Sequence, residues 1–331
     1  MPTARSTRRA IVAQLGSLAL LGPVASRAQP ALPVVGYLGA QSPASFASRI
    51  AAFREGLAEL GFVEGRNVLV EFRWAEGQHS RLPELARDLV ARQVAVIVAP
   101  GGAPAALAAK SVTTTVPIVF EMGADPVGIG LVSSLSRPEG NLTGISSLNV
   151  EVTPKRLEII HELIPTAANI AVLVNPTSPT TESQLRSLEG PARAFGLNLH
   201  ILRASTEPDF EGVFEAISRL KPDGLVVASD TFFATHSERM AALAVRHKLP
   251  AIHQSRDFAF AGGLMSYGGS FVDSHRRAGV YTGRILKGET LADLPIQQVT
   301  KLELVLNLST ARTIGLSFPL SLTIRAEHII D

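Results

Sequence analysis

The sequence has no cysteine, one tryptophan and three tyrosines among its 331 residues, and aromatic residues make up only 5% of it. The absence of cysteine excludes disulfide bridges, thiolate metal ligands, a cysteine nucleophile and a lipid-modified N-terminal cysteine. The shortage of aromatic rings leaves few platforms on which the bases of a single-stranded nucleic acid could stack. A small-molecule ligand is therefore the better expectation.

Charge of either sign is scarce as well, since charged residues make up 18% of the chain. Lysine and arginine number 31 against 29 acidic residues, but four arginines lie in the first 28 residues, which hold no acid. The rest of the chain thus has 27 basic and 29 acidic side chains, a formal charge of −2. This balance argues against a nucleic-acid-binding surface.

Long hydrophobic runs are also missing after the N-terminal region. A membrane-spanning helix would need about 20 apolar residues. The N-terminal region itself has an arginine-rich start that includes Arg8-Arg9, an apolar stretch over 11–25, and then Ser26-Arg27-Ala28. We interpret residues 1–28 as a signal peptide cleaved after Ala28. Export by the general or the twin-arginine route is open, and we expect a soluble periplasmic product without a lipid anchor.

The remaining chain alternates apolar strand-like runs with amphipathic helical stretches. Residues 33–144 contain four such runs separated by three helices, followed by a glycine- and proline-rich passage over 123–144. The runs are near-continuous rather than alternating, which is typical of parallel strands covered by helices on both faces. This pattern predicts the α/β class with a doubly wound, Rossmann-like lobe.

The same rhythm restarts after residue 144 and predicts a second lobe. Residues 145–261 include an expected helix over 232–247, and a further strand over 262–267 precedes a helix over 271–286. Because this strand and helix follow a completed lobe, we assign about 262–300 to the first lobe and about 301–331 to the second. Several crossovers of this kind would form a hinge between the lobes.

Four long phrases resemble one known family. They are FREGLAELGFVEGRNV at 53–68, VPIVFEMGADPVGIGLVSSLSRPEGNLTG at 116–144, GGLMSYG at 262–268 and the segment over 284–316. From about residue 33 to the end, the chain resembles ABC-transporter substrate-binding proteins of the type 1 periplasmic binding fold. The resemblance is to the branch that includes tryptophan- and tyrosine-type amino-acid binders.

This resemblance implies a non-enzymatic receptor that captures a small polar solute between its lobes. An amino acid or related carboxylate is one such solute, and a permease of the inner membrane would receive it. The resemblance further implies a monomer without cofactor, metal or catalytic residues. Two alternatives stay open, namely a periplasmic sensory receptor and a hydrolase that uses Ser266 on the same scaffold.

The carboxyl ends of the predicted strands indicate where the ligand would bind, since facing strand ends of two such lobes form a crevice. Gly102 and Ala103 lie between a strand and a helix, where free backbone N–H groups suit a ligand carboxylate. A plain βα turn is the alternative for this segment. Ser42 follows the first strand and could contact ligand or cap the next helix.

Further candidates are polar residues at other strand ends. Asp125 could hold a ligand ammonium or form an Asx turn, and Asp230 could contact the ligand or cap a helix. The resemblance favours a ligand contact for Asp230, and Asn175 and Gln254 would face the same crevice. Relatives that bind aromatic amino acids often have threonine before the Asp-Pro pair, whereas this chain has Ala124, so one hydroxyl is missing.

Overall fold

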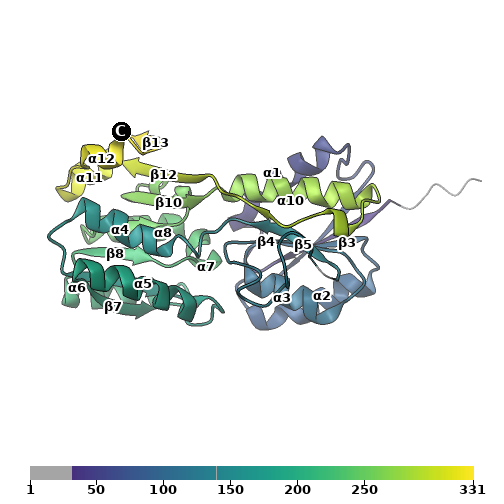
Figure 1. Ribbon diagram of the computed structural model, residues 1–331, viewed down its shortest axis with the longest axis horizontal. Coiled ribbons are helices and arrows are strands. Elements are labelled where there is room, and N and C mark those ends of the chain that lie inside the picture. The colour runs from purple at the N-terminus through teal and green to yellow at the C-terminus, as the bar shows by residue number, and fades with distance from the viewer. Residues whose placement is uncertain (1–31, 139) are drawn as a thin grey trace, which may run out of the picture. The chain divides into compact units, whose positions relative to one another are not determined.

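The computed structural model describes residues 32–138 and 140–331, and residues 32–331 form one compact unit. The predicted signal peptide and its cleavage site after Ala28 lie outside the described residues. The chain forms two α/β lobes, each with a twisted sheet between layers of helices (Figure 1). The prediction of two doubly wound lobes is confirmed.

The first lobe is built on a six-stranded sheet whose neighbouring strands all run parallel. Its inner strands are buried on both faces, as their near-continuous apolar sequences predict. In spatial order the strands are β11 (Gln297–Gln298), β5 (Leu142–Ser146), β4 (Ile118–Met122), β3 (Val96–Ala99), β1 (Val34–Gly39) and β2 (Leu69–Trp74).

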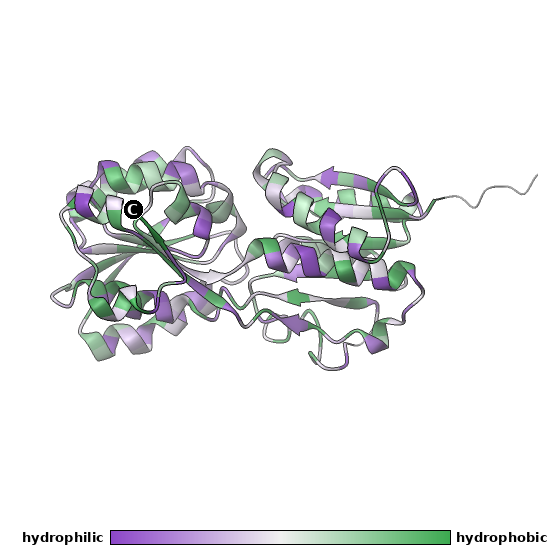
Figure 2. Ribbon diagram, turned by 90° about the horizontal axis from the view of Figure 1, so that it is seen from above, coloured by the Kyte–Doolittle hydropathy of each residue, from purple (hydrophilic) through white to green (hydrophobic). Residues whose placement is uncertain are grey.

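Helices cover both faces of this sheet. Two pack on one face around Leu89 and Ile97, and two on the other around Phe53 and Val98. In Figure 2 hydrophobic colour follows the strands and the sheet-facing sides of the helices. The first pair is α2 (Leu82–Ala91) and α3 (Ala103–Val112); the second is α1 (Ala47–Glu59) and α10 (Phe271–Leu286); single 3-10 turns cover Ala44–Phe46, His79–Arg81 and Leu291–Asp293.

The second lobe has a seven-stranded sheet in which one pair, β10 and β12, is antiparallel. In spatial order its strands are β13 (His328–Ile330), β12 (Leu302–Asn307), β10 (Met265–Gly269), β9 (Ala251–His253), β8 (Gly224–Val227), β6 (Asn169–Val174) and β7 (Asn198–Arg203). Its helices are α4 (Thr153–Leu163), α5 (Thr181–Phe195), α6 (Asp209–Leu220), α7 (Thr231–Thr235), α8 (Ser237–Arg246), α9 (Arg256–Phe260), α11 (Leu308–Ile314) and α12 (Leu320–Thr323).

The chain passes between the lobes through 147–152, at Ser270 and through 299–301. The expected return to the first lobe from residue 262 is wrong at its start, because β10 pairs with β9 and β12 in the second sheet. Both neighbours satisfy the backbone hydrogen bonds of β10, so the return begins only at Ser270.

Two other elements differ from expectation. The glycine- and proline-rich passage contains the start of β5, which was not predicted because Gly144 is atypical of a strand. Glycine is needed there, since a Cβ would lie 2.2 Å from the carbonyl oxygen of Phe120. The single helix expected over 232–247 is instead α7 and α8. The helix is interrupted at His236, whose ring Nδ1 lies 2.8 Å from the carbonyl oxygen of Phe232.

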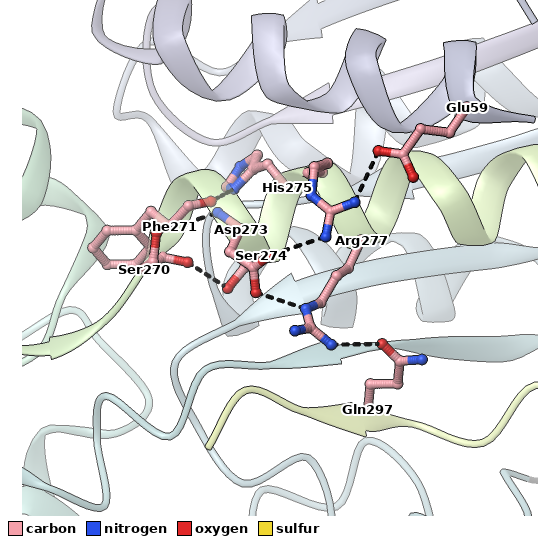
Figure 3. Close-up of polar contacts among 9 residues, drawn as sticks. Glu59, Ser270, Phe271, Asp273, Ser274, His275, Arg277 and Gln297 are labelled. Carbon is pink, nitrogen blue, oxygen red and sulfur yellow. Dashed lines mark hydrogen bonds and ion pairs between the residues drawn. The ribbon is translucent and has the colours of Figure 1, made fainter. Parts of the chain in front are cut away.

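Helix α10 follows directly from the second lobe and is fastened to the first. Arg277 donates to Asp273 (2.6 Å) and to Gln297 of β11 (3.4 Å), and Arg276 pairs with Glu59 of α1 (Figure 3). These contacts fix the first residue of the helix, Phe271, at the boundary between the lobes.

Glycines allow α1 and α10 to pack closely, and this contact predicts a large effect of one methyl group. At Gly279 an added Cβ would lie 2.1 Å from the carbonyl oxygen of Phe53. We expect Gly279→Ala to lower the free energy of unfolding in urea by about 2–3 kcal/mol through overpacking. The control is Gly190→Ala in α5, where no atom lies within 4 Å. An equal loss in both variants would contradict this explanation.

Candidate functional site

A narrow cavity lies between the lobes at the carboxyl ends of their strands, and we call it the cleft. The space between its walls is about 480 Å³ when its open mouth is included. Its walls follow β3, β4, β6, β8 and β9 and reach the start of α10. The lining residues are His79, Gly101, Gly102, Ala103, Pro104, Gly123, Ala124, Val150, Ser178, Thr180, Ser229, Asp230, Thr231, Gln254 and Phe271.

Gly102 and Ala103 line the cleft, but the two glycines of their loop direct their N–H groups away from it. The N–H of Gly101 donates to Oε2 of Glu121 (3.3 Å), and that of Gly102 donates to the carbonyl oxygen of Glu121 (3.1 Å). Both glycines have positive φ, 88° and 115°, which a residue with a Cβ rarely adopts. The loop therefore needs glycine for its backbone path.

The free N–H groups of this wall lie in the first turn of α3. Within the described ranges, the N–H groups of Ala103 and Ala105 meet no acceptor, and Pro104 between them has none to offer. Unpaired N–H groups and the helix dipole make such a terminus favourable for a carboxylate. Of the two residues predicted for the cradle, Ala103 therefore has a free N–H group and Gly102 does not.

Asp230 lies in the opposite wall, where it lines the cleft and caps a helix. Its Oδ1 accepts from the N–H of Phe232 (2.9 Å), which caps α7, and from Nδ2 of Asn175 (3.1 Å). Its Oδ2 meets no donor among the residues that the structure describes. Asn175 is buried behind the wall and orients the carboxylate, while Gln254 lines the cleft and donates to the carbonyl oxygen of Asp230 (2.7 Å).

The two other candidates do not line the cleft. The hydroxyl of Ser42 donates to that of Ser45 (3.3 Å) and stays in the turn before α1. Asp125 lines an open groove that continues outward from Ala124, and its Oδ1 accepts from the N–H of Val127 (3.0 Å). The Asx-turn alternative describes this carboxylate, because Pro126 turns the chain away from the cavity.

Arg156 is a residue of the site that sequence reasoning missed. It is fully buried in α4 and donates to the hydroxyl of Ser229 in the cleft wall (2.9 Å) and to the carbonyl oxygens of Asn149 (2.5 Å) and Tyr267 (2.9 Å). Burial lowers its pKa to about 9, so the side chain is a cation at neutral pH. Nothing in the local sequence distinguishes it from a surface arginine.

Thr231 also escaped notice, and it joins the lobes directly. Its hydroxyl donates to the carbonyl oxygen of Gly101 across the cleft. We expect Thr231→Val, which keeps the shape but loses the donor, to reduce the closed population about fivefold and to increase the ligand-free radius of gyration in X-ray scattering. The control is Thr235→Val, whose hydroxyl bonds within α7. Identical scattering from both variants would contradict the role of the Thr231 hydroxyl in joining the lobes.

The serine that a hydrolase would use does not line the cleft. Ser266 is buried in β10 beside His253 of β9, and neither lines the cavity. Burial lowers the pKa of His253 to about 3, so the ring is neutral. Among the described residues, no three His, Asp or Glu side chains gather as a metal site would require, and no helix has the length and apolarity to cross a membrane.

Comparison with known proteins agrees with this architecture. The family model described as "ABC transporter substrate binding protein" matches residues 42–330. A tyrosine-binding protein of Clostridioides difficile is 27% identical over 267 residues, which are 80% of this chain and 75% of that one.

Solved structures are similar over most of the chain. A conserved domain protein of Vibrio cholerae has a TM-score of 0.82 at 27% identity, covering 90% of this chain and 99% of its own. An ABC domain of Streptococcus pneumoniae in complex with L-Trp has a TM-score of 0.80 at 25% identity, covering 90% and 100%. On the match that spans nearly all of the described residues, the chain belongs to the ABC transporter substrate-binding protein family.

Proposed function

We propose that this protein captures a small solute carrying both a carboxylate and an ammonium group, an α-amino acid or a close analogue. The observation that carries the proposal is the pairing of opposite walls. The unpaired N–H groups of Ala103 and Ala105 on one lobe suit a carboxylate, and the free Oδ2 of Asp230 on the other suits an ammonium. A solute that binds both walls would favour the closed arrangement of the lobes.

Relatives support this ligand class, since one is named for binding tyrosine and another was solved with L-Trp. Phe271 supplies an aromatic face in the cleft, and Ala124 leaves apolar space where a hydroxyl could have stood. We further propose that the chain is exported by its N-terminal segment, acts as a monomer outside the cytoplasm, and delivers the solute to a membrane permease. Catalysis forms no part of this proposal.

The test compares ligands that differ by one charged group. Thermal unfolding of the purified protein is measured with L-tryptophan, with tryptamine, which lacks the carboxylate, and with indole-3-propionate, which lacks the ammonium. We expect a rise in melting temperature with the amino acid alone, and an amino acid among the molecules that mass spectrometry detects after denaturation. Stabilisation by a neutral sugar, or conversion of any ligand to product, would overturn the proposal.

A further inference from the structure

A buried carboxylate lies directly behind the loop that lines the cleft. Glu121, in β4, is 1% exposed, and it accepts both N–H groups of the Gly101-Gly102 loop, one with its side chain and one with its backbone. The second oxygen of its carboxyl group, Oε1, has no partner among the described residues. An acidic side chain is therefore kept in the core of the lobe with half of its hydrogen-bonding capacity unused.

The front of the same loop is bound by the other lobe. The carbonyl oxygen of Gly101 accepts from the Thr231 hydroxyl, so one peptide segment is held by Glu121 from behind and by Thr231 across the cleft. The following residues, Gly102 and Ala103, line the cavity. A change at Glu121 can thus reach the ligand-binding wall and the contact between the lobes through a single turn of backbone.

The cation that faces Glu121 is Arg49 of α1. Its guanidinium lies between the rings of Phe46 and Phe271, at 4.7 and 4.4 Å from their centroids. It makes no hydrogen bond to any described residue. Its positive charge lowers the pKa of the Glu121 carboxyl group, whereas burial raises that pKa. Asp257 of the second lobe acts on the same guanidinium, since its negative charge raises the pKa of Arg49.

Other groups around Glu121 carry no charge near neutral pH. His275 of α10 has Nδ1 at 3.9 Å from Oε2, but burial lowers its pKa to about 3, and Nδ1 donates to the carbonyl oxygen of Phe271. Tyr37 of β1 is buried, which raises the pKa of its hydroxyl, and Ser274 of α10 contributes a neutral hydroxyl. Burial raises the pKa of Glu121 to about 7, although Arg49, the N–H of Gly101 and Ser274 each lower it.

We propose that Glu121 is a positioning residue of the cleft, whose ionised form holds the Gly101-Gly102 loop in its ligand-binding position and whose protonation releases it. The part that concerns affinity rests on the proposed function, while the part that concerns the loop does not. A carboxylate accepts the Gly101 N–H more strongly than a neutral carboxyl group does. Arg49 offsets the negative charge, so repulsion of a bound carboxylate is a lesser effect. Ligand affinity should therefore fall as the pH falls through about 7.

The loop can be observed by itself, because Pro100-Gly101 is the only Pro–Gly step in the sequence. Labelling proline carbonyls with ¹³C and glycine nitrogens with ¹⁵N gives one cross-peak in a carbonyl–amide NMR experiment. We expect the chemical shift of the Gly101 amide to change between pH 6 and 8 as Glu121 titrates. Glu121→Gln keeps an acceptor for the N–H and should abolish the titration, whereas the exposed Glu84→Gln should retain it. A titration that persists in Glu121→Gln, or is missing from the wild-type protein, overturns the proposal.

Affinity for L-tryptophan supplies the second readout. Calorimetry at pH 8 and pH 6 should show wild-type and Glu84→Gln binding weakened about tenfold at the lower pH, which is the limit for loss of one required ionised group with a pKa near 7. Binding by Glu121→Gln should not change with pH. If L-tryptophan binds at neither pH, the ligand proposal fails and the NMR titration still decides the role of Glu121. Equal pH dependence in all three proteins would refute that role.

Discussion

Replacing Arg156 with methionine should lower the free energy of unfolding by about 3–5 kcal/mol. The side chain is fully buried, and its loss would leave the carbonyl oxygens of Asn149 and Tyr267 without this donor. A hydrogen bond from a charged group contributes about 1.5–3 kcal/mol. The carbonyl oxygen of Asn149 would keep only its hydrogen bond from the Ser229 hydroxyl. Methionine fills part of the volume, so the predicted loss comes mainly from the polar network. Urea unfolding monitored by circular dichroism measures it.

Loss of Arg156 should also affect the connections between the lobes, since Asn149 lies in one crossover and Tyr267 lies in the strand that leads to another. We expect Arg156→Lys to recover part of the stability, because an ammonium can replace some but not all of the donors. Arg219→Met, at an exposed site on α6, is the matched control and should change stability by less than about 0.5 kcal/mol. A similar loss in Arg156→Met and Arg219→Met would show that the network carries little energy.

Asp230→Asn should weaken the binding of an amino-acid ligand about 30-fold or more while leaving the fold intact. Asparagine caps a helix as well as aspartate does, so α7 should keep its start. The amide retains a similar shape but not the negative charge, and removing one partner of a buried ion pair costs about 2–5 kcal/mol of binding energy. Calorimetry with L-tryptophan at pH 8 compares the two proteins directly.

A second carboxylate at a helix start serves as the control for this variant. Asp209 accepts backbone N–H groups at the beginning of α6 and does not line the cleft. Asp209→Asn should bind L-tryptophan like the wild-type protein. Unchanged affinity in Asp230→Asn would remove the ammonium site from the proposal, whereas a loss in both variants would point to a general effect on the second lobe.

Particular residues show how far the site could be predicted from sequence. Asp230, Gly102 and Gln254 line the cleft because each lies two or three residues after a predicted strand, and strand ends in such lobes face the same opening. Asp125 meets the same criterion, but the Asx turn that it forms with Val127 takes its carboxylate outward. Position at a strand end is therefore a guide to the edge of the sheet and not to the direction of a side chain.

The residues that were missed act through partners distant in the chain. Glu121 is the fourth residue of a buried apolar strand and gives no local sign that its carboxyl group supports a loop 20 positions earlier. Thr231 bonds a residue 130 positions away, in the other lobe. Arg156 reads as an ordinary basic residue on an amphipathic helix until its burial is known.

The sequence by itself determined the two α/β lobes, because apolar runs and helical periodicity are properties of neighbouring residues and report which faces must leave water. It also indicated the family, through four long phrases along the chain that resemble it. Only the tertiary structure decided that β10 belongs to the second sheet, that Glu121 accepts the N–H groups of the glycine loop, and which charges are buried behind the cleft. Those outcomes depend on hydrogen bonds and packing between distant segments, whose partners no local pattern specifies.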